Sequence, residues 1–221
     1  MKVYIETYGC TANQNHTMLI KHLLLNSGYS ISPNPNTANL IIINTCVVKQ
    51  QTENKIVSRL KKLKKTGKKI LITGCGVDAE YEYFKSILPE AIFLSSHHTK
   101  DIVYAVKTGK SILGKREEEK FFISKGARHI TEISQGCLGN CSFCITKNAR
   151  GKLISYSEDS IIKDIECAIK NGAKEIFLTS QDNSCYGFDK GTNLARLLKR
   201  ICEVKGDFFV RVGMMNPLHI R

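Results

Sequence analysis

Short apolar runs alternate with amphipathic stretches along the first half of the chain. Continuous apolar, β-branched segments predict four buried strands over residues 2–8, 39–44, 69–73 and 91–94. Helical spacing of apolar positions predicts a helix after each strand, over residues 16–26, 51–65, 79–88 and 101–108. Strands that alternate with helices pack as a parallel sheet with helices on its faces. We therefore expect an α/β domain built on an open parallel sheet.

This pattern fails between residues 109 and 126, where charged residues dominate (GKSILGKREEEKFFISKG), and then resumes. The failure predicts a linker or connecting hairpin. Beyond it we expect strands over residues 129–134, 175–179 and 208–212, with helices over 157–171 and 194–204. The expected domains are 1–110 and 127–221, joined by a linker over 111–126. Since a complete (β/α)₈ barrel needs about 250 residues, the second domain is either a small open sheet or part of a larger barrel.

The composition is that of a folded globular protein, with 42% hydrophobic and 24% charged residues among 221. Its net charge of +13 favours an anionic partner such as nucleic acid. The helix expected over 51–65 carries six basic residues that suit phosphate contacts, although a solvated surface helix has the same pattern; they are Lys55, Arg59, Lys61, Lys62, Lys64 and Lys65. Apolar runs such as 40–43 are far shorter than the ~20 residues that span a membrane, and Glu6 argues against a signal peptide. We expect a cytoplasmic protein with no membrane partner.

Nine cysteines in a reducing compartment need an explanation other than disulfides. Cys137, Cys141 and Cys144 form the pattern CxxxCxxC directly after an expected strand. Gly136 and Gly139 allow this loop to curl around a ligand. An iron–sulfur cube, normally held by four thiolates, fits three of them with one iron left open. Zinc is the rival, and it would require a fourth cysteine or histidine at a characteristic spacing.

Three further cysteines share a structural position although they are far apart in sequence. Cys10, Cys46 and Cys75 each follow an expected strand of the first domain. The carboxyl ends of parallel strands line one edge of a sheet, where ligands bind, and Gly9 and Gly74 permit close backbone approach there. The pattern predicts a second three-thiolate site, with buried free cysteines as the alternative. Of the remaining cysteines, we interpret Cys167 and Cys202 as core thiols and assign no ligand role to Cys185.

These residues together resemble the radical S-adenosylmethionine (SAM) methylthiotransferases. The segments YGCTANQ, NTCVV, GCLGNCSFCITKNARGKLISY, EIFLTSQD, YGFDKGTNL and RVGMMNP are similar to the archaeal and eukaryotic branch, which acts on threonylcarbamoyladenosine in tRNA. The resemblance implies a Rossmann-like N-terminal domain followed by the first half of a radical SAM partial (β/α) barrel. It also implies two [4Fe–4S] clusters, each held by one of the two cysteine triplets, and SAM as a further cofactor.

The resemblance further implies a transferase reaction. At the CxxxCxxC cluster SAM would be cleaved to a 5′-deoxyadenosyl radical, and the other cluster would hold the sulfur to be delivered, giving 2-methylthio-N6-threonylcarbamoyladenosine at tRNA position 37. The implied partners are tRNA, a flavodoxin- or ferredoxin-like electron donor and a sulfur source. No residue is assigned as a catalytic group. Phe143, Arg150, Gln181 and Asp182 are expected to contact SAM or the base.

Chains of this family continue through a second half-barrel and an RNA-binding β domain, whereas this sequence stops at Arg221. We therefore expect a fragment, a truncated gene product, or a chain whose barrel another polypeptide completes. Three other functions are open. They are methylthiolation of a ribosomal protein or another tRNA adenosine, a non-catalytic iron–sulfur remnant that binds RNA, and a zinc-binding RNA module.

Overall fold

The computed structural model describes residues 1–114 and 126–220, which fall into two compact units. Unit 1 is Met1–Glu118 with Phe143–Ala149, and unit 2 is Glu119–Ser142 with Arg150–Arg221. Most of the linker expected over 111–126 lies outside the described residues. Its first residues pack on unit 1, because Ile112 forms a bridge with Leu94.

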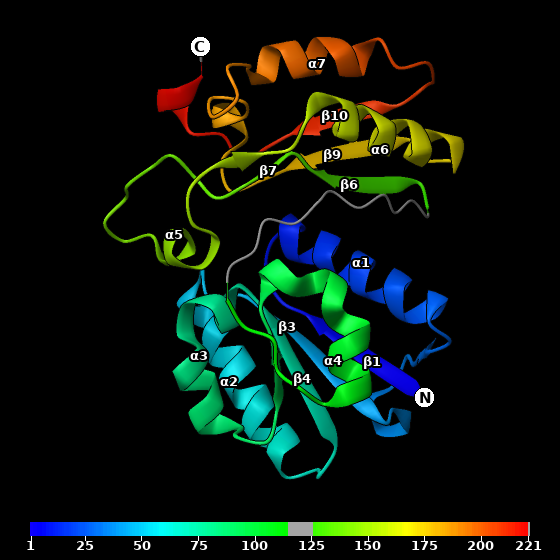
Figure 1. Ribbon diagram of the computed structural model, residues 1–221, viewed down its shortest axis with the longest axis vertical. Coiled ribbons are helices and arrows are strands. Elements are labelled where there is room, and N and C mark those ends of the chain that lie inside the picture. Colours follow the sequence, from blue (N-terminus) through cyan, green and yellow to red (C-terminus); the bar gives the residue numbers. More distant parts are fainter. Residues whose placement is uncertain (115–125, 221) are drawn as a thin grey trace. The chain divides into compact units, whose positions relative to one another are not determined.

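Unit 1 is built on a five-stranded parallel sheet in the order β2-β1-β3-β4-β5 (Figure 1). The strands are β1 (Lys2–Thr7), β2 (Ser30–Ile31), β3 (Leu40–Thr45), β4 (Lys69–Gly74) and β5 (Ile92–Leu94). The four strands predicted from the sequence are confirmed. Strand β2 was not predicted, because two residues are too short to show a periodic pattern. Every residue of the central strand β3 is buried, as expected for a parallel strand covered on both faces.

Helices cover both faces of this sheet (Figure 1). On one face, α1 (Thr11–Asn26) and α4 (Ile102–Thr108) pack against Leu40 and Ile42. On the other, α2 (Gln50–Lys64) and α3 (Cys75–Ile87) pack against Ile41 and Ile43. Two short 3₁₀ helices, η1 (Pro35–Thr37) and η2 (Ser96–Asp101), complete the unit.

Two helices of unit 1 begin earlier than predicted. Helix α1 starts at Thr11 instead of residue 16, and its first turn is polar, so it lacks the apolar spacing on which the prediction rested. Helix α3 starts at Cys75 and is interrupted at Glu80, whose backbone is not helical. The helix predicted over 79–88 corresponds to the segment after this kink.

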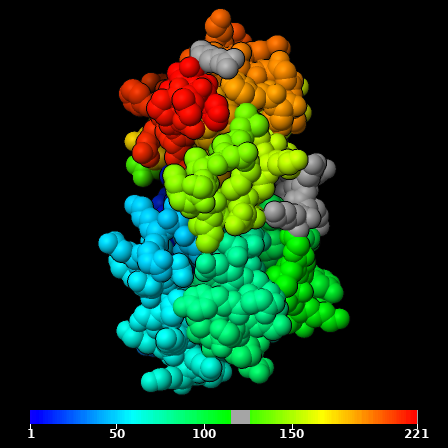
Figure 2. Space-filling model, turned by 90° about the vertical axis from the view of Figure 1, so that its left-hand side faces the viewer, coloured from blue at the N-terminus to red at the C-terminus, as the bar shows by residue number. Residues whose placement is uncertain are grey.

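The basic residues of α2 are not equivalent. Arg59 donates from Nε and Nη2 to Oε1 of Glu6 at 2.9 and 2.5 Å, in a partly buried ion pair with β1. It is therefore engaged within unit 1. Five lysines along or just after α2 remain exposed; they are Lys55, Lys61, Lys62, Lys64 and Lys65. Figure 2 shows this part of the chain in cyan. The predicted basic surface therefore contains these five lysines and not Arg59, which is paired with Glu6.

Unit 2 contains a three-stranded parallel sheet in the order β10-β9-β6. Its strands β6 (Arg128–Glu132), β9 (Glu175–Thr179) and β10 (Phe209–Val212) match the predicted ones. Helices α6 (Glu158–Lys170) and α7 (Leu194–Cys202) pack Ile161, Ile165 and Leu197 against Ile176 and Leu178. In the part of the chain that the structure describes, no helix is long and apolar enough to cross a membrane.

Several short elements connect these strands and were not predicted. They are the antiparallel pair β7 (Ser134–Gln135) and β8 (Ile154–Ser155), the helix α5 (Ile145–Arg150), and the 3₁₀ helices η3 (Asn183–Cys185) and η4 (Pro217–His219). Each spans at most six residues, which is too short for a reliable helical or alternating pattern.

Candidate metal centres

Three cysteines lie at the carboxyl edge of the sheet of unit 1. Cys10 immediately precedes α1, Cys46 follows β3, and Cys75 is the first residue of α3, directly after β4. Strands β1 and β3 are the pair at which the strand order reverses direction. Ligands of open α/β sheets bind at such a switch point. Cys46 and Cys75 are buried and Cys10 is partly exposed, so Cys10 is the member of the group that faces solvent.

The three thiols are neighbours in space. A Cβ atom at Gly9 would lie 2.5 Å from Cβ and 2.7 Å from Sγ of Cys46, so the loop after β1 touches the cysteine after β3. Burial raises the pKa of the Cys46 thiol, and negative charge on the nearby Cys75 and Cys10 raises it further. None of the three forms a disulfide. The convergence expected from the sequence is present, and the group fits a cluster held by three cysteines with one iron open; their role as ligands stays a prediction.

Asn13, in the first turn of α1, joins the loops that carry these cysteines. Its Nδ2 donates to the carbonyls of Tyr8 and Thr45 at 2.7 and 2.8 Å, and its Oδ1 accepts from Sγ of Cys75 at 3.5 Å. Asn13 is fully buried. Sequence reasoning missed it, although a polar residue three positions after a candidate ligand, in a segment quoted for the resemblance, was an available signal. We assign Asn13 a positioning role.

Gly74 is the position where backbone conformation matters most in this site. Its φ is +93°, a region that favours glycine. A Cβ there would overlap Oδ1 of Asn44 and the carbonyl oxygen of Thr45, and would lie 2.7 Å from the Thr45 nitrogen. Asn44 is itself fixed, since its Nδ2 donates to the carbonyl of Asn13 at 2.9 Å. Glycine is therefore required for β4 to deliver Cys75 beside β3.

A second group of cysteines starts on a glycine-rich loop of unit 2. The backbone N–H of Gly139 donates to Sγ of Cys137 at 3.3 Å, and a Cβ at Gly139 would lie 3.4 Å from that sulfur and 3.9 Å from Sγ of Cys141. Both thiols thus flank Gly139. Gly136 has φ +73°, and a Cβ there would overlap the carbonyl of Lys152. The loop curls as predicted, with sulfur atoms close to its backbone.

The third cysteine of this motif lies in a different unit. Cys144 and Phe143 belong to the segment 143–149 that packs with unit 1, where Ala149 is part of the buried core. The meeting of Cys144 with Cys137 and Cys141 therefore stays a prediction from the CxxxCxxC spacing. Phe143 is 87% exposed, which leaves its ring available to stack on a planar group.

The other residues expected to contact SAM have contrasting surroundings. Gln181 follows β9, and its Oε1 is buried with no hydrogen-bond partner among the described residues. It thus offers an acceptor to a bound ligand. The Asp182 carboxylate already accepts hydrogen bonds from Ser184 and His219. Arg150 is buried at the end of α5. The roles of all these residues in SAM binding stay predictions.

The remaining cysteines differ from one another. Cys202 is exposed on α7, so its interpretation as a core thiol is wrong: its place in the last turn of the helix faces solvent. Cys167 is partly exposed. Cys185 is fully buried, and this burial raises the pKa of its thiol to about 11.

Two family models match separate parts of the chain, and related proteins align with nearly all of it. Residues 2–95 match the family described as Uncharacterized protein family UPF0004, and residues 131–217 match the Radical SAM superfamily. Proteins named probable threonylcarbamoyladenosine tRNA methylthiotransferase are 39% identical in Pyrococcus horikoshii and 41% identical in Archaeoglobus fulgidus. They align with 100% and 99% of this chain and with 54% and 53% of their own length. The chain spans about half the length of these curated relatives.

A human protein named threonylcarbamoyladenosine tRNA methylthiotransferase is 31% identical over 99% of the chain and 40% of its own length. Among solved structures, the radical SAM methyltransferase TsrM from Kitasatospora setae matches with a TM-score of 0.59 and 10% identity, over 91% of this chain and 51% of that one. The cobalamin-dependent SAM radical enzyme OxsB matches with a TM-score of 0.59 and 12% identity, over 95% and 38%. At such identity these structures show the fold alone. Unit 2 carries part of a radical SAM fold rather than a small independent sheet.

Proposed function

We propose that this chain, which belongs to the radical SAM methylthiotransferase family, provides the two metal centres of an enzyme that modifies tRNA. The enzyme would add a methylthio group to C2 of N6-threonylcarbamoyladenosine at position 37. The carrying observation is the convergence of Cys10, Cys46 and Cys75 at one sheet edge, in a chain that also carries a CxxxCxxC loop. The names of the relatives support the choice of reaction and substrate.

Each cysteine triplet would hold a [4Fe–4S] cluster with one iron open to another ligand. When bound, the cluster at the CxxxCxxC loop supplies the electron for SAM cleavage, and the cluster at Cys10, Cys46 and Cys75 carries the sulfur. The chain's own residues orient these groups. Asn13 holds the cysteine loops of unit 1 in register, and the backbone N–H of Gly139 donates to the sulfur of Cys137. A flavodoxin- or ferredoxin-like donor and a sulfur source are the further proposed partners.

We propose, from the sequence resemblance, that Phe143, Arg150 and Gln181 contact SAM or the base. The buried Oε1 of Gln181 would accept a hydrogen bond from SAM, because no described residue donates one to it. The exposed ring of Phe143 would stack on the adenine. Arg150 would contribute a guanidinium near the end of α5.

The substrate itself can be tested in the organism that carries the gene. Deleting the gene for this chain is expected to leave N6-threonylcarbamoyladenosine in tRNA while removing its 2-methylthio derivative, as measured by mass spectrometry of digested tRNA. Restoring the gene should restore the modified nucleoside. An unchanged tRNA profile with loss of a methylthio group from a ribosomal protein would contradict the proposed substrate.

Contact with tRNA phosphates is proposed for the exposed lysines of α2. Changing Lys61 and Lys62 to glutamine is expected to weaken tRNA binding and to reduce the slope of log affinity against log salt by up to about 1.8, since each phosphate contact contributes about 0.9. The matched control changes Lys163 and Lys170, two exposed lysines on α6, to glutamine. Equal effects of the two double substitutions would show that net charge, rather than the α2 surface, determines affinity.

A further inference from the structure

Asp182, Cys185 and His219 bring three kinds of metal-binding atom together within unit 2. A carboxylate oxygen, a thiol sulfur and an imidazole nitrogen all lie within 4.8 Å of one another. We propose that these residues bind a divalent transition-metal ion of the zinc class. None of the three belongs to a cysteine triplet, although Cys185 also contacts the backbone of Leu138 in the CxxxCxxC loop. The proposal does not use the cysteine triplets, and it gives Asp182 a metal-binding role in place of the SAM contact expected from the sequence.

The atoms are close to the spacing that a metal ion requires. Nδ1 of His219 faces Oδ2 of Asp182 at 2.7 Å, and Sγ of Cys185, which donates to the backbone carbonyl of Asp182 at 3.2 Å, lies within 4.8 Å of both other ligand atoms. Ligand atoms about 2.0–2.3 Å from a tetrahedral zinc ion lie roughly 3.3–3.8 Å apart. The nitrogen–oxygen distance thus needs to open by about half an ångström when an ion replaces the hydrogen-bonded proton. The Cys185 sulfur must in addition leave its hydrogen bond to the Asp182 carbonyl to reach the ion.

The carboxylate of Asp182 is held in one orientation. Its Oδ1 accepts hydrogen bonds from the backbone nitrogens of Ser184 and Asn216 at 3.0 and 3.2 Å, and from the Ser184 hydroxyl. These three donors fix Oδ1 and leave Oδ2 directed at His219. Hydrogen bonds to the ligating carboxylates are a regular feature of metal sites, because they orient the ligand before the ion arrives.

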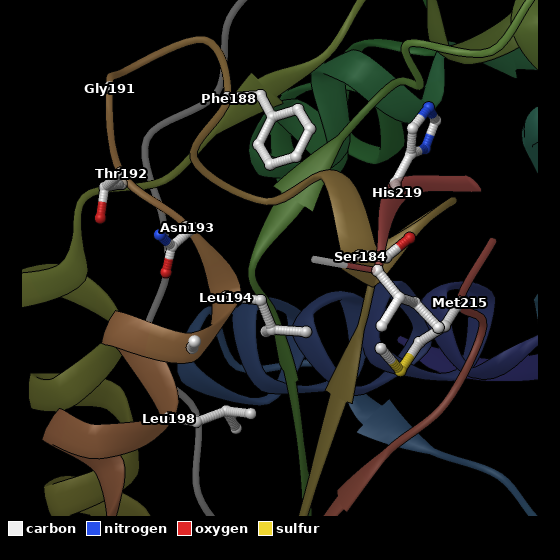
Figure 3. Close-up of a pocket in the computed structure, with 11 residues that line it drawn as sticks. Ser184, Phe188, Gly191, Thr192, Asn193, Leu194, Leu198, Met215 and His219 are labelled. Carbon is white, nitrogen blue, oxygen red and sulfur yellow. The ribbon is translucent and has the colours of Figure 1, made fainter. Parts of the chain in front are cut away.

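A pocket reaches one member of the group, His219. Asp182 and Cys185 are buried, whereas His219 is partly exposed and lines a pocket of about 520 Å³ together with Ser184 and Phe188 (Figure 3). The His219 ring meets the Phe188 ring edge-on, with 6.2 Å between their centroids. Among the described residues that line the pocket there is no lysine or arginine to repel a cation. An ion held by the three side chains would keep its fourth coordination position for water or a small ligand.

The mixed set of donors decides the class of ion. Magnesium and calcium prefer oxygen ligands, whereas nitrogen and thiolate ligands suit zinc and its neighbours in the transition series. Binding requires the Cys185 thiol to release its proton to solvent, and the proton that Nδ1 of His219 donates to Asp182 to move to Nε2 through solvent, so that Nδ1 can bind the ion. A thiolate, a carboxylate and a neutral imidazole then surround the divalent cation.

The test compares zinc content among matched variants of the whole chain. Anaerobically reconstituted protein is incubated with excess Zn²⁺, desalted, and analysed for zinc and iron. The Cys185→Ala and His219→Gln variants are each expected to hold about one zinc per chain less than the parent. The control Cys202→Ala, which removes an exposed cysteine from α7, should match the parent. Circular dichroism establishes that each variant is folded, and the partly exposed His219 supplies a second arm if loss of the buried thiol perturbs the fold.

X-ray absorption at the zinc edge of the parent should show one sulfur together with nitrogen and oxygen ligands. A sulfur-only shell would place the zinc at the cysteine triplets and overturn the proposal, as would equal zinc in all four proteins. Loss of iron in Cys185→Ala with unchanged zinc would instead assign Cys185 to the neighbouring CxxxCxxC loop, and it too would overturn the proposal. Failure of the iron–sulfur assignment is separately visible, because iron would then be low in every protein while the zinc difference persists.

Discussion

Reductive cleavage of SAM is expected to disappear when Cys137, Cys141 and Cys144 are all replaced by alanine. No other thiolate set in the chain has their compact spacing, so the SAM-binding cluster would have no ligands left. Iron content should fall from about eight to about four atoms per chain, as loss of one of two four-iron clusters requires. The measurements are iron and sulfide analysis and chromatography of 5′-deoxyadenosine from the reduced protein with SAM. Full iron content in the variant would refute the assignment.

The other triplet supplies the matched comparison. Replacing Cys10, Cys46 and Cys75 by alanine should lower iron by the same amount yet leave SAM cleavage measurable, because the CxxxCxxC loop is untouched. Methylthio transfer to tRNA should be abolished. This activity is measured with the same substitutions in a completed protein that catalyses the whole reaction. If both activities vanish while the remaining cluster is intact, the proposed division between the two centres is wrong. Normal product from this variant would contradict it more strongly.

Replacing Gly74 by alanine is expected to destabilise unit 1 severely. The substitution combines a positive φ of +93° with overlap of the new Cβ with Asn44 and with the Thr45 backbone. Backbone strain costs about 1–3 kcal/mol and overpacking a similar amount, so the free energy of unfolding should fall by roughly 2–6 kcal/mol. Urea unfolding followed by circular dichroism measures this loss.

Gly67→Ala is the control for that experiment. Gly67 also has a positive φ, +64°, but a Cβ there meets no atom within 4 Å. It should cost about 1 kcal/mol from backbone conformation alone. If the two substitutions destabilise the protein equally, the contact between the Gly74 backbone and strand β3 does not contribute to stability. A mild effect at Gly74 would also weaken the argument that glycine is needed to place Cys75.

Much of the architecture could be predicted because its signals are local and repeated. Strand β3 begins with the apolar run 40–43, whose burial follows from that pattern, and it ends with Asn44 and Thr45, which are buried with hydrogen bonds to other segments. The meeting of Cys10, Cys46 and Cys75 could be predicted because parallel strands place their carboxyl ends at one edge. This inference needed only the order of elements, not their packing. Strand β2 escaped prediction because it is defined by pairing with β1 rather than by any property of Ser30 and Ile31.

The parts of the site that could not be predicted depend on contacts between distant residues. Asn13 is one of several polar residues in its segment, and only its bonds to Tyr8 and Thr45 distinguish it. The cluster of Asp182, Cys185 and His219 likewise exists because η4 returns to the loop after β9. Sequence reasoning set Cys185 aside, since a thiol without a cysteine or histidine nearby in sequence gives no spacing to read. Only the folded structure shows that Cys185 lies close to Asp182 and His219.

Two helices start at the cysteines of unit 1, and this has a consequence for electron affinity. Cys10 caps the start of α1 and Cys75 opens α3, so the positive ends of two helix dipoles meet the thiolates. A cluster held there would become more negative by one charge on reduction. Because the dipole ends stabilise the more negative form, they would raise the reduction potential of this centre relative to the same cluster in water. The helix starts at Cys10 and Cys75 would therefore favour the reduced form of a cluster held by these thiolates.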